Sequence, residues 1–251
     1  MPETVVLLHG FSGTRRSWDA VAGQLDRERY LPLALDLPGH GAATGEDRPI
    51  TFSSCVAEVL ARSPERFVLC GYSLGGRVAL HVALAAPARV TRLVLVSTTA
   101  GIADPRERAA RRAADRRLAR ELEEISIEEF IERWREQPLF AEDPVEVGER
   151  AAADQRLGRP GRLAAALRGI GTGEMEPLWE RLRELTMPVT VTAGERDVKF
   201  LALARRMTAL LPAGELAVVP GGHRLPFESP AALAGVLEGS DRLDAEPGGG
   251  R

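Results

Sequence analysis

The stretch Gly71-Tyr72-Ser73-Leu74-Gly75 places a serine between glycines, where the pattern of a buried strand changes to that of a helix. A serine on such a sharp turn presents its hydroxyl at the edge of a sheet, and small flanking residues let strand and helix approach closely. The pattern therefore predicts a nucleophilic serine at Ser73. A glycine-rich turn that binds phosphate is the alternative, although no Gly-Lys-Ser/Thr follows the motif.

A serine hydroxyl needs a base, and the sequence contains four histidines. His81 lies eight residues along the predicted helix from Ser73, which is about 12 Å at 1.5 Å per residue and too far for contact. His9 and His40 lie at a strand end and in a turn, where histidines are more often structural than catalytic. His223 directly follows the last predicted strand, where loops project at the carboxyl edge of a parallel sheet. We therefore expect His223 to be the base.

The chain order serine, acid, histidine requires a carboxylate at the end of a strand between Ser73 and His223. Asp197 fits, because the turn Gly194-Glu195-Arg196-Asp197 follows a predicted strand. Glu195 is the competing acid, although its side chain would leave the turn earlier. Negative charge on a reacting oxygen would be held by two backbone N–H groups. We expect these from Leu74, at the start of the predicted helix, and from Phe11, in the glycine-containing loop after the first strand.

The elements that must position these residues alternate along the chain. Six short, nearly continuous apolar runs predict strands that are covered on both faces. They lie at 4–9, 31–36, 66–71, 90–97, 188–193 and 215–219, and helical patterns lie at 18–27, 52–62, 74–86, 201–211 and 230–237. This alternation predicts an α/β fold with a mostly parallel sheet of about six strands and helices on both faces.

One interval interrupts the alternation. From about residue 102 to 183 the sequence predicts several helices rich in Arg, Glu and Ala and no strand, and the interval is too long for a loop. We expect a helical cap over one edge of the sheet. The predicted division is a core of residues 1–100 and 184–238, a cap of residues 101–183, and a disordered tail of residues 239–251.

Composition excludes several classes of protein. The 251 residues carry 33 Lys plus Arg and 36 Asp plus Glu, a net charge of −3 that offers no field for nucleic-acid phosphates. The two cysteines, Cys55 and Cys70, have no metal-ligand spacing and favour a reducing compartment. Neither a signal peptide nor a membrane span is predicted. We expect a cytoplasmic monomer that acts on a small molecule, with no metal, cofactor, nucleic acid or membrane as partner.

These motifs resemble the α/β-hydrolase superfamily over about residues 4–237. The closer resemblance is to the menaquinone-pathway 2-succinyl-6-hydroxy-2,4-cyclohexadiene-1-carboxylate synthases. The matching stretches are His9-Gly10-Phe11-Ser12-Gly13, Asp36-Leu37-Pro38-Gly39-His40-Gly41, Gly71-Tyr72-Ser73-Leu74-Gly75-Gly76-Arg77, Trp134-Arg135-Glu136-Gln137-Pro138-Leu139-Phe140, Gly171-Thr172-Gly173, Pro177-Leu178-Trp179 and Gly194-Glu195-Arg196-Asp197 with Lys199-Phe200. The first three are widely shared among α/β hydrolases, whereas Arg77 and the cap stretches are specific to the synthases.

The resemblance implies a lyase that eliminates pyruvate from a polycarboxylate after removing a proton next to a ketone, without metal or organic cofactor. It implies a catalytic triad of Ser73, Asp197 and His223, and in this reading the Phe11 and Leu74 amides expected above would hold the enolate oxygen. The substrate-binding residues that it implies are Tyr72, Arg77, Arg111, Trp134 and Arg156. One position departs from the family, since Pro226 stands where a second histidine usually follows the catalytic one.

Three of the implied substrate contacts have open alternatives. Neighbouring arginines permit a shifted register for Arg111 and Arg156, and either could lie on a solvated helix face. Trp134 could equally belong to the packing of the cap.

Two other functions also remain open. A serine ester hydrolase or carbon–carbon-bond hydrolase would use the same triad through an acyl-enzyme. A non-catalytic ligand-binding member of the superfamily would commonly lack a triad residue, and none is missing here. Fold and triad alone do not separate lyase from hydrolase. Only Arg77 and the cap motifs favour the lyase.

Overall fold

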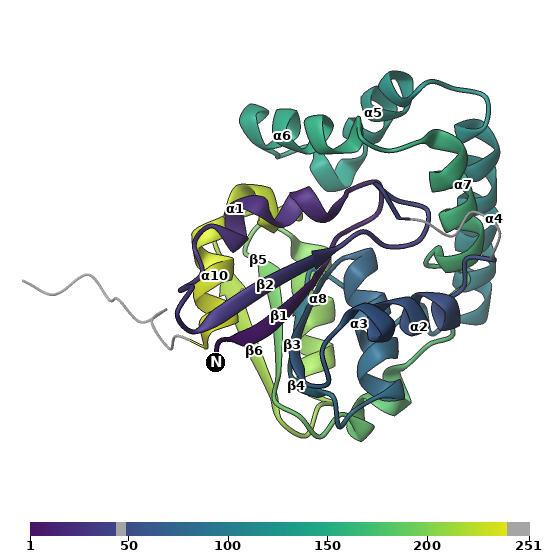
Figure 1. The fold of residues 1–251 in the computed structure, drawn as a ribbon. Helices are drawn as coiled ribbons and strands as arrows, with labels where there is room; N and C mark the ends of the chain where they lie inside the picture. Colours follow the sequence, from purple (N-terminus) through teal and green to yellow (C-terminus); the bar gives the residue numbers. More distant parts are fainter. Residues whose placement is uncertain (44–48, 240–251) are drawn as a thin grey trace, which may run out of the picture.

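The computed structural model describes residues 1–43 and 49–239 (Figure 1). In this part of the chain a single six-stranded sheet has the order β2-β1-β3-β4-β5-β6, and every neighbouring pair is parallel. The strands are β1 (Glu3–Leu8), β2 (Tyr30–Leu35), β3 (Phe67–Tyr72), β4 (Val90–Val96), β5 (Val189–Gly194) and β6 (Gly214–Val219). The α/β fold and the six strands are as expected, and each strand begins and ends within one residue of its predicted bounds.

The strands are apolar throughout because both faces of the sheet are covered. Along β1, Val5 and Leu7 belong to one buried cluster, and Val6 and Leu8 belong to the cluster on the opposite face. This alternation follows from the two-residue repeat of a strand. All four side chains are fully buried, so a polar residue at any of these positions would lose its hydration without gaining a partner.

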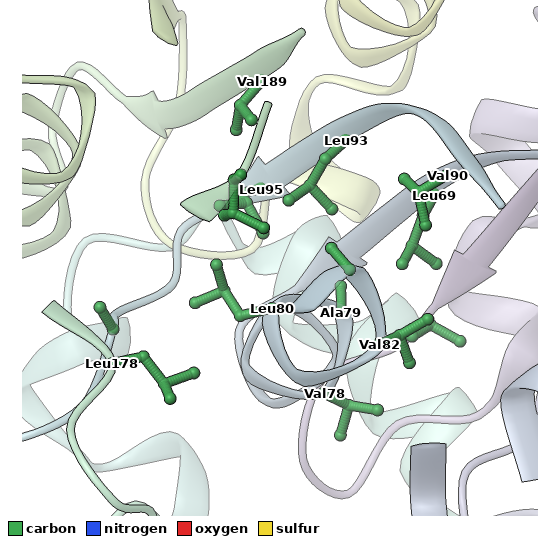
Figure 2. Close-up of a cluster of buried hydrophobic side chains, with 14 of the residues drawn as sticks. Leu69, Val78, Ala79, Leu80, Val82, Val90, Leu93, Leu95, Leu178 and Val189 are labelled. Carbon is green, nitrogen blue, oxygen red and sulfur yellow. The ribbon is translucent and has the colours of Figure 1, made fainter. Parts of the chain in front are cut away.

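Two sets of helices supply the cover (Figure 1). The helices α2 (Phe52–Arg62), α3 (Leu74–Ala85) and α8 (Val198–Thr208) pack on one face. The helices α1 (Asp19–Ala22), α9 (Leu225–Glu228) and α10 (Pro230–Glu238) pack on the other. Figure 2 shows part of the first cluster, in which Ala79 of α3 points toward the strands that carry Leu69 and Leu93, while Val78 lies on the far side of the helix.

The interval between β4 and β5 is helical, as expected. It contains α4 (Pro105–Leu122), α5 (Ile127–Arg135), α6 (Val145–Gln155) and α7 (Pro160–Ile170), with the 3₁₀ turns η2 (Pro138–Phe140) and η3 (Trp179–Glu184). We call residues 101–183 the helical insertion. Figure 1 shows α5 and α6 beyond the end of the sheet at which β1 and β2 terminate. The insertion has its own apolar cluster, which includes Ala119, Phe130 and Leu163.

Two helices differ from their predicted bounds. The predicted helix 18–27 is only the short α1, preceded by the 3₁₀ turn η1 (Arg15–Trp18), whose N-cap is the Thr14 side chain. The predicted helix 201–211 begins earlier, because the Asp197 carboxylate caps α8 by accepting from the N–H of Phe200. Apart from Gly239, the tail predicted to be disordered lies outside the described residues.

Both cysteines are free thiols inside the core. Cys55 of α2 belongs to the cluster on one face of the sheet, and Cys70 of β3 to the cluster on the other. Burial raises the pKa of Cys55 to about 12 and raises the pKa of Cys70 as well. Among the described residues, no helix combines the length and apolar character needed to cross a bilayer.

Candidate active site

Ser73 stands on the sharp turn between β3 and α3. Its backbone has φ of 51° and ψ of −106°, a conformation that is rare for a residue with a side chain. The turn is held because the Ser73 N–H donates to the Val96 carbonyl at 2.9 Å. A Cβ atom on Gly75 would lie 2.2 Å from the carbonyl oxygen of Leu8, so α3 can approach β1 this closely only with glycine there.

His223 connects this serine to a buried carboxylate. Its Nδ1–H donates to Asp197 Oδ2 at 2.7 Å, and the Ser73 hydroxyl donates to its Nε2 at 3.3 Å. Asp197 Oδ1 accepts from the Phe200 N–H at 3.2 Å, which fixes the carboxylate at the start of α8. The competing acid, Glu195, is exposed and makes no such contact. The three side chains named from the sequence therefore form one hydrogen-bonded series.

The imidazole of this series is buried. Burial lowers the pKa of His223 below 6.5, and the hydrogen bond to Asp197 partly opposes this shift. The rings of Phe200 and Tyr72 lie with centroids 4.5 and 5.5 Å from that of His223. At neutral pH the ring is uncharged and its Nε2 is available to take a proton, as a general base requires.

The two backbone amides expected to hold negative charge both border the same cavity as Ser73. Leu74 is the first residue of α3, and its N–H has no acceptor within the helix. The N–H of Phe11 has no acceptor among the described residues either. Within the part of the chain that the structure describes, neither N–H therefore has an acceptor, as the donors of an oxyanion hole require.

The cavity has a volume of about 1130 Å³ and lies between the carboxyl end of the sheet and the helical insertion. The triad residues, both amide donors, and Tyr72 line it. Its charged lining residues are Arg77, Arg111, Arg196, Lys199, Arg206, Arg224, Asp104, Glu107, Asp115, Glu142, Asp143, Asp154 and Asp197. This size and mixed lining suit a ligand with several polar groups.

Arg77 lies one turn after Ser73 and is only 6% exposed. Its Nη1–H donates to the Ile170 carbonyl at 2.7 Å, and within the described residues it forms no ion pair with a carboxylate. Burial, followed by the charge of Arg111, lowers the pKa of Arg77 to about 9, so it remains a cation at neutral pH. An unpaired buried guanidinium beside a nucleophile is suited to hold a substrate carboxylate.

The three insertion residues differ in their positions. Arg111 lines the cavity, and its Nε–H donates to Asp115 Oδ1 at 2.7 Å. Among residues 1–43 and 49–239 its two terminal nitrogens have no partner, so they can bind a ligand. Trp134 also lines the cavity and packs on Phe11, with ring centroids 5.2 Å apart. Arg156 is not brought to the cavity: it is exposed at the end of α6. The preceding residues face inward instead, because each step along a helix turns the side chain by about 100°.

The two histidines expected to be structural are both fully enclosed. His9 Nδ1–H donates to the Gly10 carbonyl at 2.8 Å, and its Nε2 accepts from the Leu37 N–H at 3.0 Å. His40 packs against His9 with ring centroids 5.0 Å apart, and burial lowers the pKa of His40 to about 3. Neither ring lines the cavity.

The sequence matches the family model described as "Alpha/beta hydrolase family" over residues 5–236. The chain belongs to the alpha/beta hydrolase family. A 2-succinyl-6-hydroxy-2,4-cyclohexadiene-1-carboxylate synthase of Enterobacter sp. (strain 638) is 34% identical, with 93% of this chain and 89% of that protein covered. The enzyme of the same name from Salmonella agona (strain SL483) is 32% identical, with 93% and 92% covered.

This chain is also similar to solved structures. The structure of MenH from S. aureus superposes with a TM-score of 0.89 at 32% identity, covering 94% of this chain and 92% of that one. A thermophilic esterase from Thermogutta terrifontis superposes with a TM-score of 0.75 at 25% identity, covering 95% and 89%.

One charged pair at the site was missed from the sequence. Arg224, directly after His223, is 4% exposed and forms a 3.2 Å ion pair with Asp143 of the insertion. Its guanidinium carbon lies 3.9 Å from the centroid of the Phe140 ring. Burial is the main cause that raises the pKa of Asp143 to about 6. The adjacency of Arg224 to the expected base was the available signal. Pro226, at the position where the resemblance to the synthases implied a second histidine, is buried in α9.

Proposed function

We infer that this chain is a 2-succinyl-6-hydroxy-2,4-cyclohexadiene-1-carboxylate synthase, a lyase of menaquinone biosynthesis. Its substrate is 2-succinyl-5-enolpyruvyl-6-hydroxy-3-cyclohexene-1-carboxylate, from which it eliminates pyruvate. The observation that carries this inference is the 32–34% identity to synthases of that name over 93% of the chain. Arg77, which is buried one turn after Ser73 and has no carboxylate partner among the described residues, supports a substrate that carries carboxylates.

The reaction begins with removal of the proton next to the substrate ketone. Ser73 Oγ takes this proton while its own proton passes to His223 Nε2, and Asp197 stabilises the resulting imidazolium. The negative charge moves to the ketone oxygen, where the N–H groups of Phe11 and Leu74 donate to it. Such donors contribute about 3 kcal/mol each to the stability of the charged state.

Elimination completes the reaction. The electrons of the enolate return through the ring and break the carbon–oxygen bond to the enolpyruvyl group, which takes up the transferred proton and leaves as pyruvate. Arg77 and Arg111 bind carboxylates, and Tyr72 and Trp134 form the wall around the ring. No acyl-enzyme forms, and the chemistry needs no metal or organic cofactor.

The helical insertion acts as the cap of this site, and residues 1–100 with 184–238 form its catalytic core. A cytoplasmic location agrees with the two free thiols. We propose a monomer, because every group that the mechanism uses comes from one chain. Size-exclusion chromatography with light scattering tests this state, and a stable dimer would contradict it.

The deciding experiment compares pyruvate release from the enolpyruvyl substrate with hydrolysis of a simple aryl ester. We expect rapid pyruvate release, and we expect Ser73→Ala and His223→Ala to lose most of the rate while remaining folded. Strong ester turnover without pyruvate release would reject the lyase. It would instead favour a hydrolase that acts through an acyl-enzyme, as in the esterases of this fold.

A further inference from the structure

The loop that carries the Phe11 amide is held from the helical insertion. Residues 10–14 follow β1, and the last two residues of α6, Asp154 and Gln155, form hydrogen bonds to this loop across 140 and 143 positions of sequence. Both side chains are about 95% buried and line the cavity. The mechanism above gives neither of them a task.

Asp154 binds the end of the loop through both carboxylate oxygens. The Thr14 N–H donates to Oδ2 at 2.9 Å, and the Thr14 hydroxyl donates to Oδ1 at 2.5 Å. The same hydroxyl accepts from the Arg16 N–H at 3.2 Å, so Thr14 links the carboxylate to the start of η1. A buried carboxylate needs such donors, and here a single loop residue supplies two of them.

Gln155 binds the middle of the loop. Its Nε2–H donates to Ser12 Oγ at 2.7 Å. Ser12 has φ of 62°, a left-handed conformation that a side chain disfavours, so the neighbouring contacts must hold it. Within the loop itself, the Gly13 N–H donates to the Gly10 carbonyl at 3.2 Å. Phe11 lies between the end of β1 and Ser12, which Gln155 binds. The direction of the Phe11 N–H therefore depends on the contact between Gln155 and Ser12.

We propose that Asp154 and Gln155 are positioning residues, which hold the loop so that the Phe11 N–H faces the reacting oxygen. The proposal rests on the proposed function, because that function assigns the oxyanion role to Phe11. It makes formation of the oxyanion hole depend on the docking of α6 against the core. A hydrogen bond that forms with the charged oxygen lowers the barrier without strengthening substrate binding, so its loss acts on kcat rather than on KM.

The test uses Asp154→Asn and Gln155→Leu in the full chain, with Glu149→Gln as the matched control. Glu149 lies on the exposed side of α6, far from the loop contacts. We expect each of the two variants to lower kcat for pyruvate release about 10- to 100-fold with KM within about twofold. The control should keep both constants. A wild-type kcat in Asp154→Asn and Gln155→Leu, or a raised KM with unchanged kcat, would overturn the proposal.

A second pair of variants covers the case in which Asp154→Asn does not fold. Thr14→Ser keeps both donors to Asp154, whereas Thr14→Val removes the hydroxyl. We expect the serine variant to retain kcat and the valine variant to lose it, with circular dichroism showing both folded. Equal rates for the two would overturn the positioning role.

Failure of the proposed function would look different. If the unsubstituted chain releases no pyruvate, the same variants are compared by their affinity for an aryl trifluoromethyl ketone, whose adduct with Ser73 carries an oxyanion. Weaker binding by Asp154→Asn and Gln155→Leu than by Glu149→Gln then supports positioning although the lyase is rejected. Equal binding overturns it.

Discussion

Arg77 and Ile170 are joined across the boundary between the sheet core and the helical insertion. The guanidinium of Arg77 donates from Nη1 to the carbonyl at the end of α7, at 2.7 Å. This bond occupies one of five N–H groups and fixes the plane of the others. The cation one turn after Ser73 is thus oriented by α7, which also lines the cavity.

Replacing Arg77 should mainly weaken substrate binding. A charge-assisted hydrogen bond contributes about 1.5–3 kcal/mol, so Arg77→Met should raise KM for the enolpyruvyl substrate about 10- to 100-fold. The KM of Arg77→Lys should lie between those of the wild type and Arg77→Met. Lysine keeps the charge, but it has no planar group that can bind both the Ile170 carbonyl and a carboxylate. Steady-state kinetics check this, with Arg150→Met on the exposed side of α6 as control. An unchanged KM in Arg77→Met would remove the main structural reason for an acidic substrate.

The pH dependence of kcat/KM should report His223. Its folded pKa is lowered below 6.5 by burial, so the neutral, proton-accepting ring persists as pH falls through 6.5. The rate should therefore be level from pH 8 to about 6.5 and decline only at lower pH. A stopped-flow profile across this range tests it. A decline that is already half complete at pH 7 would contradict the buried, neutral base.

His40 should make folding stability sensitive to acid. Its pKa is about 3 in the folded protein and 6.5 in the unfolded chain, so between these values the unfolded chain binds more protons. The stability that the neutral His40 ring contributes is therefore complete above pH 6.5 and is lost as pH falls toward 3. At pH 4 the loss amounts to about 3 kcal/mol. Urea unfolding of wild type and His40→Phe at pH 7 and pH 4 checks this. From pH 7 to pH 4 the free energy of unfolding should fall less in His40→Phe than in the wild type. An equal fall in both would contradict this role of His40.

Two glycines should respond oppositely to alanine. At Gly75 the new Cβ would lie 2.2 Å from the Leu8 carbonyl oxygen, so we expect Gly75→Ala to cost about 3 kcal/mol or more and to disturb Ser73. At Gly235, inside α10, nothing lies within 4 Å of the new atom. Gly235→Ala should stabilise the protein by about 0.5–1 kcal/mol, since alanine favours a helix. Thermal unfolding measures both, and a stable Gly75→Ala would show that α3 is free to move.

Much of the fold was predictable because buried parallel strands consist of continuous runs of apolar residues. The grouping of Ser73, Asp197 and His223 was also predictable, because each follows a predicted strand and the carboxyl ends of parallel strands lie at the same edge of the sheet. The start of α8 was misjudged because apolar residues marked its middle, while the Asp197 cap marked its beginning.

The contents of the insertion were harder to predict. Arg156 was expected at the substrate and is exposed, whereas Gln155, one residue earlier, lines the cavity. The end of α6 consists mostly of small and polar residues, so a shift by one position leaves its sequence pattern nearly unchanged. The contact between Asp154 and Thr14 joins residues 140 positions apart, and no local pattern announces such a pairing.

Cys55 and Cys70 give the molecule two built-in reporters. Each thiol is shielded within a different layer, one on either side of the sheet, and each resists ionisation there. A thiol-specific reagent can modify them only when the surrounding layer opens, so its rate measures how often that opening occurs. The Cys55→Ala and Cys70→Ala chains, each keeping one native thiol, would show whether the two layers separate from the sheet together or one before the other.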